Sequence, residues 1–269
     1  MPLIEANGIV QEYEVSGPEA GLPLVLVHEL GGSLHSWDRC MPALAESGRR
    51  VLRYNWRGTG ASEKIKGELA VDTLCEDLAA LLKAVGFPQP TDIAGTALGG
   101  GVALAFAARY PLTVRRLAVS SPAIGGSDGL ESMLRGRADE VEISGMRPQV
   151  DRSLDRSYLE KYRTDAQSFT DYRNRWVAND PVSYASHNRM LAAMDETGNL
   201  SAIRCPTLVV GGEDDMLLTP AMMQPIADAI SQGEYLRLPT GHFLPVNTPE
   251  VWSESVLPWL NESAATTAA

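Results

Sequence analysis

Short apolar, β-branched runs alternate with longer segments of helical periodicity along most of this chain. A run that is apolar throughout is typical of a strand buried on both faces, and helices between such strands indicate a parallel sheet. We therefore predict a doubly wound α/β fold with a mostly parallel sheet covered on both faces. The main predicted strands are residues 24–27, 50–54, 92–94, 117–120, 207–210 and 234–238.

The helical segments carry apolar residues at intervals of three and four. In residues 71–85, Leu74, Leu78, Leu81 and Leu82 fall on one face, which predicts a helix packed on the sheet. Near the N-terminus, runs at 4–7 and 11–15 predict an antiparallel hairpin that turns at Asn7-Gly8. The other predicted helices are residues 34–46, 98–109, 220–231 and 249–260.

Composition restricts the class of protein and its partners. With 269 residues, 44% of them apolar, the chain can bury one sizeable core. Lys and Arg number 23 against 34 Asp and Glu, and the net charge of −11 disfavours binding to nucleic acid or an anionic membrane. We expect a small-molecule substrate as the partner, and the oligomeric state stays open between a monomer and a homo-oligomer.

The sequence also predicts a cytoplasmic location. No apolar run approaches the roughly 20 residues of a membrane span, and the first residues lack the basic flank and apolar stretch of a signal peptide. The three cysteines, Cys40, Cys75 and Cys205, are odd in number and form no CxxC pair, which suits a reducing compartment and gives no zinc pattern. No cluster has metal-ligand spacing, and no nucleotide-binding loop is present.

Residues 127–198 differ from the rest of the chain in composition and in hydrophobic pattern. Arg, Asp, Glu, Met and Tyr are frequent there, and no strand-like run occurs. We expect a helical lid over the carboxyl ends of the strands, where ligands bind in open α/β folds. The core is then 1–126 and 199–262, with a flexible tail at 263–269. Most arginines of the lid are expected on a solvated face, but one or two can clamp a substrate carboxylate.

A glycine-rich turn follows one predicted strand and precedes a helix. Its five residues, Gly95-Thr96-Ala97-Leu98-Gly99, have the layout of the G-x-S-x-G elbow, with Ala97 in place of the serine. Side chains at the flanking glycines would collide with the neighbouring strand and helix. Because Ala97 offers only a methyl group, no acyl-enzyme can form there. Thr96 is adjacent, but a shift of one residue on a tight turn points its hydroxyl elsewhere.

Four further motifs occur at the ends of predicted strands, in order: residues 27–32, 56–62, 212–215 and 241–242. Together with the elbow, they give the chain a sequence that resembles the α/β-hydrolase superfamily over about residues 3–260, with spacing similar to the 3-oxoadipate enol-lactonase branch. The resemblance implies a catalytic acid at Asp215, a catalytic histidine at His242, and an oxyanion hole made by the backbone N–H groups of Leu30 and Leu98.

The residues themselves support this assignment. The elbow, Asp215 and His242 occur in the chain order that this fold uses, and the last two lie on loops after apolar strands. A histidine can accept a proton while a carboxylate fixes its tautomer and stabilises the imidazolium. Asp214 is the competing acid, although the spacing favours Asp215.

Glu29 is a second departure from the family pattern, which leads one to expect a small residue there. A carboxylate beside the oxyanion loop opposes a developing oxyanion. If it faces the pocket, it can instead stabilise protonated His242 or act as a second acid or base. Ala97 is either an engineered replacement of serine or a natural divergence, and two departures in one site favour divergence.

Other residues are predicted with structural or pocket-lining roles. Trp37, Trp176 and Met216 are candidates to line the substrate pocket. His28 is interpreted as a brace for the oxyanion loop, and Arg57 as a salt bridge or carbonyl brace beneath the site.

The sequence therefore predicts an α/β-hydrolase-family enzyme that acts on a small, largely apolar carbonyl compound such as an ester, lactone or enol-lactone. His242 and Asp215 would supply a general base without a cofactor. Two alternatives stay open: a cofactor-free lyase, isomerase or oxygenase that uses the same pair, and a non-catalytic small-molecule receptor.

Overall fold

One eight-stranded sheet organises the molecule, which a computed structural model describes for residues 1–125 and 128–262. The order across the sheet is β1-β2-β4-β3-β5-β6-β7-β8. β1, β2 and β4 pair antiparallel and all later neighbours pair parallel, so the predicted, mostly parallel α/β architecture is confirmed. The strands are β1 (Leu3–Ala6), β2 (Ile9–Ser16), β3 (Pro23–Val27), β4 (Arg50–Tyr54), β5 (Thr91–Thr96), β6 (Val114–Ser120), β7 (Thr207–Gly212) and β8 (Gly233–Leu238).

The N-terminal hairpin turns where the sequence predicts. Asn7 and Gly8 have φ values of 52° and 70°, the left-handed conformations that a two-residue hairpin turn of this hand requires. Asn7 also donates a hydrogen bond from its amide to Oδ1 of Asp77, 2.7 Å away, which ties the turn to helix α2 (Val71–Val85).

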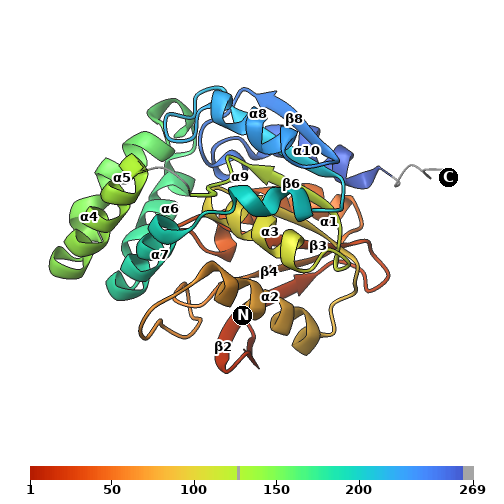
Figure 1. The fold of residues 1–269 in the computed structure, drawn as a ribbon, viewed down its shortest axis with the longest axis horizontal. Helices are drawn as coiled ribbons and strands as arrows, with labels where there is room; N and C mark the ends of the chain where they lie inside the picture. The colour runs from red at the N-terminus through yellow and green to blue at the C-terminus, as the bar shows by residue number, and fades with distance from the viewer. Residues whose placement is uncertain (126–127, 263–269) are drawn as a thin grey trace.

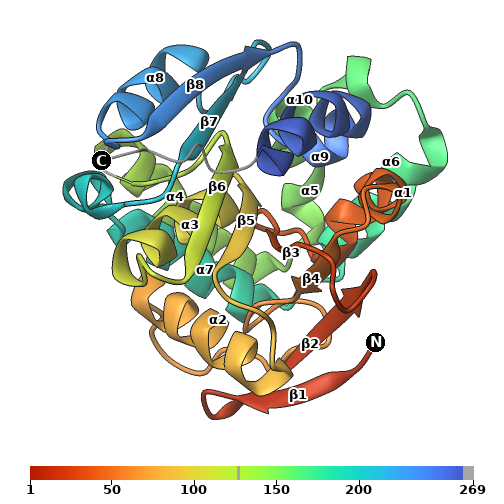
Figure 2. The ribbon, with the colours of Figure 1, turned by 90° about the vertical axis from the view of Figure 1, so that its right-hand side faces the viewer.

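Helices cover both faces of the sheet (Figure 2). Side chains of adjacent strand residues point to opposite faces, so Val25 packs in one apolar cluster and Leu24 in the other. The first cluster includes residues of α2, α3 (Leu98–Arg109) and α8 (Pro220–Asp228). The second includes residues of α1 (Met41–Glu46) with the preceding 3-10 helix η1 (Leu34–Cys40), of α9 (Leu244–Asn247) and of α10 (Pro249–Asn261).

A helical insertion, defined here as the segment between β6 and β7, gathers beside the sheet (Figure 1). Part of it forms a third apolar cluster with Ala97, Phe243 and Val246 of the core. The predicted tail, 263–269, and Ser127, where the lid is predicted to begin, lie outside the described residues. The elements of the insertion are α4 (Asp128–Ser144), η2 (Arg147–Gln149), α5 (Val150–Ser157), η3 (Glu160–Tyr162), α6 (Ala166–Val177), α7 (Pro181–Ala193) and η4 (Thr197–Ala202).

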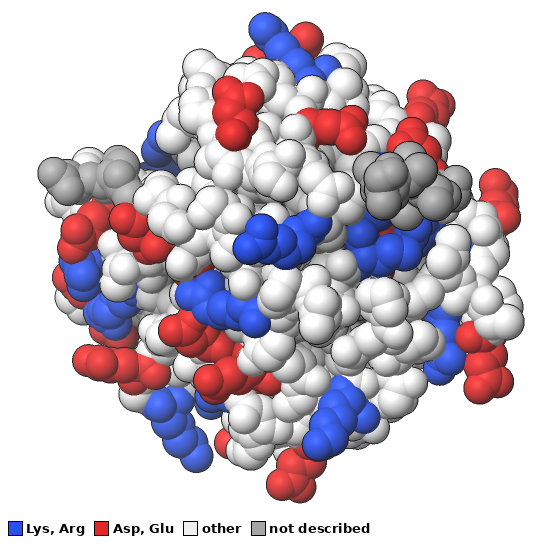
Figure 3. All heavy atoms as spheres, turned by 45° about the vertical axis from the view of Figure 1, so that its right-hand side comes forward, with Lys and Arg blue, Asp and Glu red and all other residues white. Residues whose placement is uncertain are grey.

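The outer surface carries charges of both signs. On the face drawn in Figure 3, basic and acidic side chains are interspersed among uncharged ones. None of the helices within the described ranges has the length and apolar character needed to cross a bilayer.

A buried ion cluster ties the C-terminal helix to the sheet. Arg49 donates to Oδ2 of Asp92 over 2.7 Å and to the carbonyl of Leu260 in α10, and both charged side chains are almost fully buried. Arg115 donates to the same Asp92 oxygen and the same Leu260 carbonyl. Asp92 therefore compensates two guanidinium groups at the start of β5.

Replacing Asp92 by Asn should destabilise the protein by about 3–5 kcal/mol, because it leaves buried guanidinium charge without a carboxylate. Urea unfolding measures this change in the free energy of unfolding. Glu131→Gln is the matched control: it breaks the exposed pair with Arg135 on α4 and should cost less than about 0.5 kcal/mol. Equal, small effects of the two changes would show that the buried cluster carries no net stability.

Candidate active site

The turn between β5 and α3 holds Ala97 in a conformation that L residues rarely adopt, with φ 49° and ψ −120°. Its N–H donates to the carbonyl of Ser120 over 2.9 Å, and its own carbonyl accepts from the N–H groups of Gly101 and Ala123. These hydrogen bonds hold the strained backbone in place. The elbow geometry is thus present although the side chain at its tip is a methyl group.

The glycines that flank the elbow are required by close backbone contacts, as predicted. A Cβ atom on Gly95 would lie 2.6 Å from the carbonyl oxygen of Gly99, and one on Gly99 would lie 2.2 Å from that of His28. Thr96 is fully buried and does not line the cavity next to Ala97. The structure therefore gives no support to Thr96 as a substitute nucleophile.

His242 and Asp215 meet at the carboxyl ends of β8 and β7. Nδ1 of His242 lies 2.8 Å from Oδ2 of Asp215. The other carboxylate oxygen of Asp215 accepts from the backbone N–H groups of Leu217 and Leu218, at 2.8 and 2.9 Å. Nε2 has no hydrogen-bond partner among the described residues, and His242 helps to line the cavity.

Asp215 is held as a carboxylate. Burial alone would raise the pKa of Asp215, but the charge and hydrogen bond of His242 and the Leu218 N–H outweigh it and lower that pKa below its usual range. The competing acid, Asp214, turns away and binds the Tyr162 hydroxyl and the Lys161 ammonium group of the insertion. Of the two candidate acids, the structure brings Asp215 to His242.

Two backbone N–H groups lie where an oxyanion hole is predicted. Leu98 begins α3, whose N-terminal end carries a partial positive charge, and Leu30 lies on the loop after β3. Both residues line the cavity together with Ala97 and His242. Within residues 1–125 and 128–262, neither N–H has a hydrogen-bond acceptor.

Glu29 lies behind the oxyanion loop and outside the cavity lining. It is fully buried, and its Oε1 accepts hydrogen bonds from the hydroxyls of Ser36 and Tyr172, at 2.7 and 2.8 Å. Its Oε2 has no partner among the described residues. Burial raises the pKa of Glu29, and the two hydroxyl hydrogen bonds only partly oppose this. The protonated form of Glu29 is thus favoured more than that of an exposed glutamate.

A cavity of about 150 Å³ lies over the elbow. Its inner wall is formed by Ala97, Leu98, Leu30 and His242, and its outer wall by residues of α4, α5, α7 and the loop after β7. Most of the lining is apolar, as is usual for a site that takes a small organic ligand.

Three residues that the sequence suggested for the pocket lie elsewhere. Trp37 is fully buried against Trp252 in the cluster under α10, because η1 turns it toward the sheet. Met216 is 62% exposed, since the bend after Asp215 points it to solvent and turns Leu217 and Leu218 inward. Trp176 packs against Tyr184 beneath the oxyanion loop and supports that loop from below.

Sequence reasoning also missed lining residues of the site. Phe243 directly follows His242, so adjacency to a candidate catalytic residue was an available signal. Tyr184 and Met133 come from the insertion, and nothing in the sequence marks which faces of these helices meet the core. Side chains of the described residues form no group of three or more His, Cys, Asp or Glu suited to a metal ion.

The remaining buried polar residues brace the site. His28 contacts the carbonyl of Glu29 through Nδ1 and packs on Trp56, and burial lowers its pKa to about 3. His187 of α7 contacts the carbonyl of Arg57 through Nε2, and burial lowers its pKa to about 4. Arg57 forms a bidentate salt bridge with Asp77. His28 and Arg57 thus have the bracing contacts that the sequence suggested.

Comparison with known proteins matches this geometry to one family. A family model described as the alpha/beta hydrolase fold matches residues 23–249. The chain belongs to the α/β-hydrolase fold family. The resemblance to the enol-lactonase branch is also confirmed among its relatives.

Three α/β-hydrolase relatives illustrate the likeness. The provisionally named carbamate hydrolase RutD of Variovorax paradoxus is 30% identical, over 94% of this chain and 97% of its own. The 3-oxoadipate enol-lactonase 2 of Acinetobacter baylyi is 25% identical over 94% of both chains. The crystal structure of the enol-lactonase of Burkholderia xenovorans superposes with a TM-score of 0.90 and 27% identity, over 97% of this chain and all of that one.

The raised pKa of Glu29 makes a pH-dependent contribution to stability. The folded state binds the proton of Glu29 more tightly than the unfolded state does. The stability that this proton contributes is therefore lost as the pH rises above about 4.3, the ordinary pKa of a glutamate side chain. A glutamine at this position cannot lose a proton in this way. The free energy of unfolding of Glu29→Gln should therefore rise relative to that of the parent protein as the pH increases above this value, by at most about 1.4 kcal/mol per pH unit. Urea unfolding across a pH series measures the difference, and a difference that does not vary with pH would contradict the assignment.

Proposed function

We propose that this α/β-hydrolase-family protein is an enzyme that hydrolyses a small carbonyl compound, an ester, lactone or enol-lactone, with His242 as general base on water. The observation that carries the proposal is the 2.8 Å contact of His242 Nδ1 with Asp215, together with the place of His242 in the cavity over Ala97. The hydrolase names of the relatives support the reaction class. The helical insertion acts as the lid of this site.

In the proposed reaction the oxygen of a water molecule attacks the carbonyl carbon while its proton passes to Nε2 of His242. Asp215 stabilises the imidazolium through Nδ1–H. The Leu30 and Leu98 N–H groups donate to the oxygen that becomes negative, and loss of one such donor commonly costs about 10²–10³ in rate. The C–O bond to the leaving group then breaks, and His242 returns its proton to the leaving oxygen. The reaction uses neither a covalent intermediate at Ala97 nor a cofactor.

Glu29 has a positioning role in this proposal. Its Oε1 joins η1 to α6 through Ser36 and Tyr172, and a Cβ atom on Gly32 would lie only 2.1 Å from that oxygen. The carboxyl group thereby fills the space behind the loop that carries Leu30. Because it does not line the cavity, it acts on the reaction through the loop.

A small-molecule receptor is the second candidate, and the methyl group at Ala97 favours it, since a receptor needs no nucleophile. The buried His242–Asp215 pair favours an enzyme, because binding alone needs no proton acceptor. The proposal also places the protein in the cytoplasm as a monomer or homo-oligomer without nucleic-acid or membrane partners. Its three free, buried cysteines support a reducing compartment.

His242→Ala should lower the rate of hydrolysis of short p-nitrophenyl esters by about 10²–10⁴, the usual contribution of a general base. The matched control is His35→Ala, because His35 is partly exposed, pairs with Asp38 and lies outside the cavity. Tight ligand binding without turnover in the parent protein would instead identify a receptor.

Restoring a serine tests the origin of Ala97. If Ala97 is a natural divergence in a water-based site, Ala97→Ser should change the esterase rate little and give no burst of p-nitrophenol. A burst equal to the enzyme concentration, found only in Ala97→Ser, would show that the site is built for an acyl-enzyme.

A further inference from the structure

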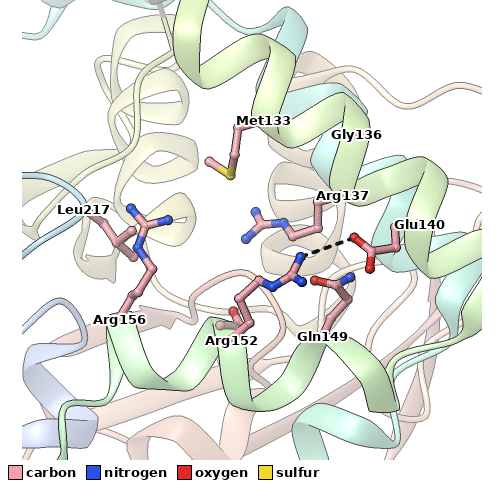
Figure 4. A pocket seen from close by; sticks show the side chains of 9 residues that line it. Met133, Gly136, Arg137, Glu140, Gln149, Arg152, Arg156 and Leu217 are labelled. Atoms are coloured by element: carbon pink, nitrogen blue, oxygen red, sulfur yellow. Dashed lines mark ion pairs between the residues drawn. The ribbon is translucent and has the colours of Figure 1, made fainter.

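A second pocket of about 340 Å³ lies outside the catalytic cavity, between α4 and α5 (Figure 4). Met133, Arg137, Ser153, Arg156 and Leu217 line both spaces, so the two pockets adjoin. We call the outer pocket the mouth. A ligand larger than the inner cavity of about 150 Å³ would extend toward it.

The mouth is cationic in a chain of net charge −11. Arg137, Arg152 and Arg156 line it, against Glu140 as its one carboxylate. Arg152 lies 3.5 Å from Glu140, whereas the guanidinium groups of Arg137 and Arg156 point into the open space in Figure 4. Nε of Arg137 donates to Asn188, and among the described side chains neither Arg137 nor Arg156 has a carboxylate partner.

Gln149 packs beside the same mouth. It is 3% exposed and lines the pocket beside Arg152, and its Nε2 is buried without a hydrogen-bond acceptor within the described residues. Because this nitrogen is closed off from the open space, the cationic groups that the mouth offers to a ligand are the guanidinium groups of the arginines.

We propose that the mouth binds a carboxylate group of the substrate whose carbonyl reacts in the inner cavity. The substrate is then a carbonyl compound with an apolar middle and an anionic far end. Arg137 and Arg156 clamp the carboxylate, and Arg152, held by Glu140, adds positive potential. The position of the reacting end rests on the proposed function, whereas the anionic subsite rests on the outer pocket itself.

Isothermal titration calorimetry of the full chain with glutarate, and with its neutral analogue glutaramide, tests the subsite without any turnover. Glutarate should bind and glutaramide should not. Arg156→Gln and Arg137→Gln should each weaken glutarate binding about tenfold or more, the usual effect of losing hydrogen bonds to a charged group. Arg135→Gln is the matched control on the same helix, outside the mouth, and should leave binding unchanged.

The results for subsite and reaction are separable. Equal binding of glutarate and glutaramide, no binding of glutarate, or equal affinity of the parent and Arg156→Gln would overturn the subsite even if esters are hydrolysed. Selective glutarate binding in a protein that hydrolyses no ester would support the subsite and overturn only the proposed reaction.

Discussion

Nδ1 of His242 and Oδ2 of Asp215 are 2.8 Å apart, in loops that follow two neighbouring parallel strands. Because Gly212 pairs with Leu238 at the ends of β7 and β8, both loops leave the sheet at the same edge. Two backbone N–H groups hold the other oxygen of Asp215, so the carboxylate is fixed in orientation. The proposed proton transfer depends on this contact, since a carboxylate acceptor favours the proton on Nδ1 and leaves Nε2 as the acceptor.

The elbow next to this pair has a strained backbone conformation at Ala97, although the serine that usually occupies this position is absent. A non-glycine residue at positive φ costs on the order of 1–3 kcal/mol, and three hydrogen bonds hold Ala97 there. In the proposed reaction the Leu98 N–H at this turn stabilises the developing oxyanion, His242 is the base, and water supplies the attacking atom.

Most of the fold could be predicted from the sequence because its signals are local. Apolar runs such as 207–210, the Asn7-Gly8 turn and the glycines beside Ala97 each depend on nearby backbone geometry. The order of the motifs then placed Asp215 and His242 on loops at one edge. Side-chain directions in irregular segments could not be predicted: Trp37 turned to the core and Met216 to solvent, since packing against distant elements decides them. The clustering of Arg137 and Arg156 likewise depends on how α4 meets α5.

The tautomer of His242 tests the central claim most directly. Nitrogen-15 NMR of the imidazole, recorded where the ring is neutral, distinguishes a proton on Nδ1 from one on Nε2. The account predicts the Nδ1–H form in the parent protein and a shift toward the Nε2–H form in Asp215→Ala, which removes the acceptor. An Nε2–H form in the parent protein, or a spectrum that Asp215→Ala leaves unchanged, would contradict it, because His242 would then have no free nitrogen facing the cavity to accept a proton.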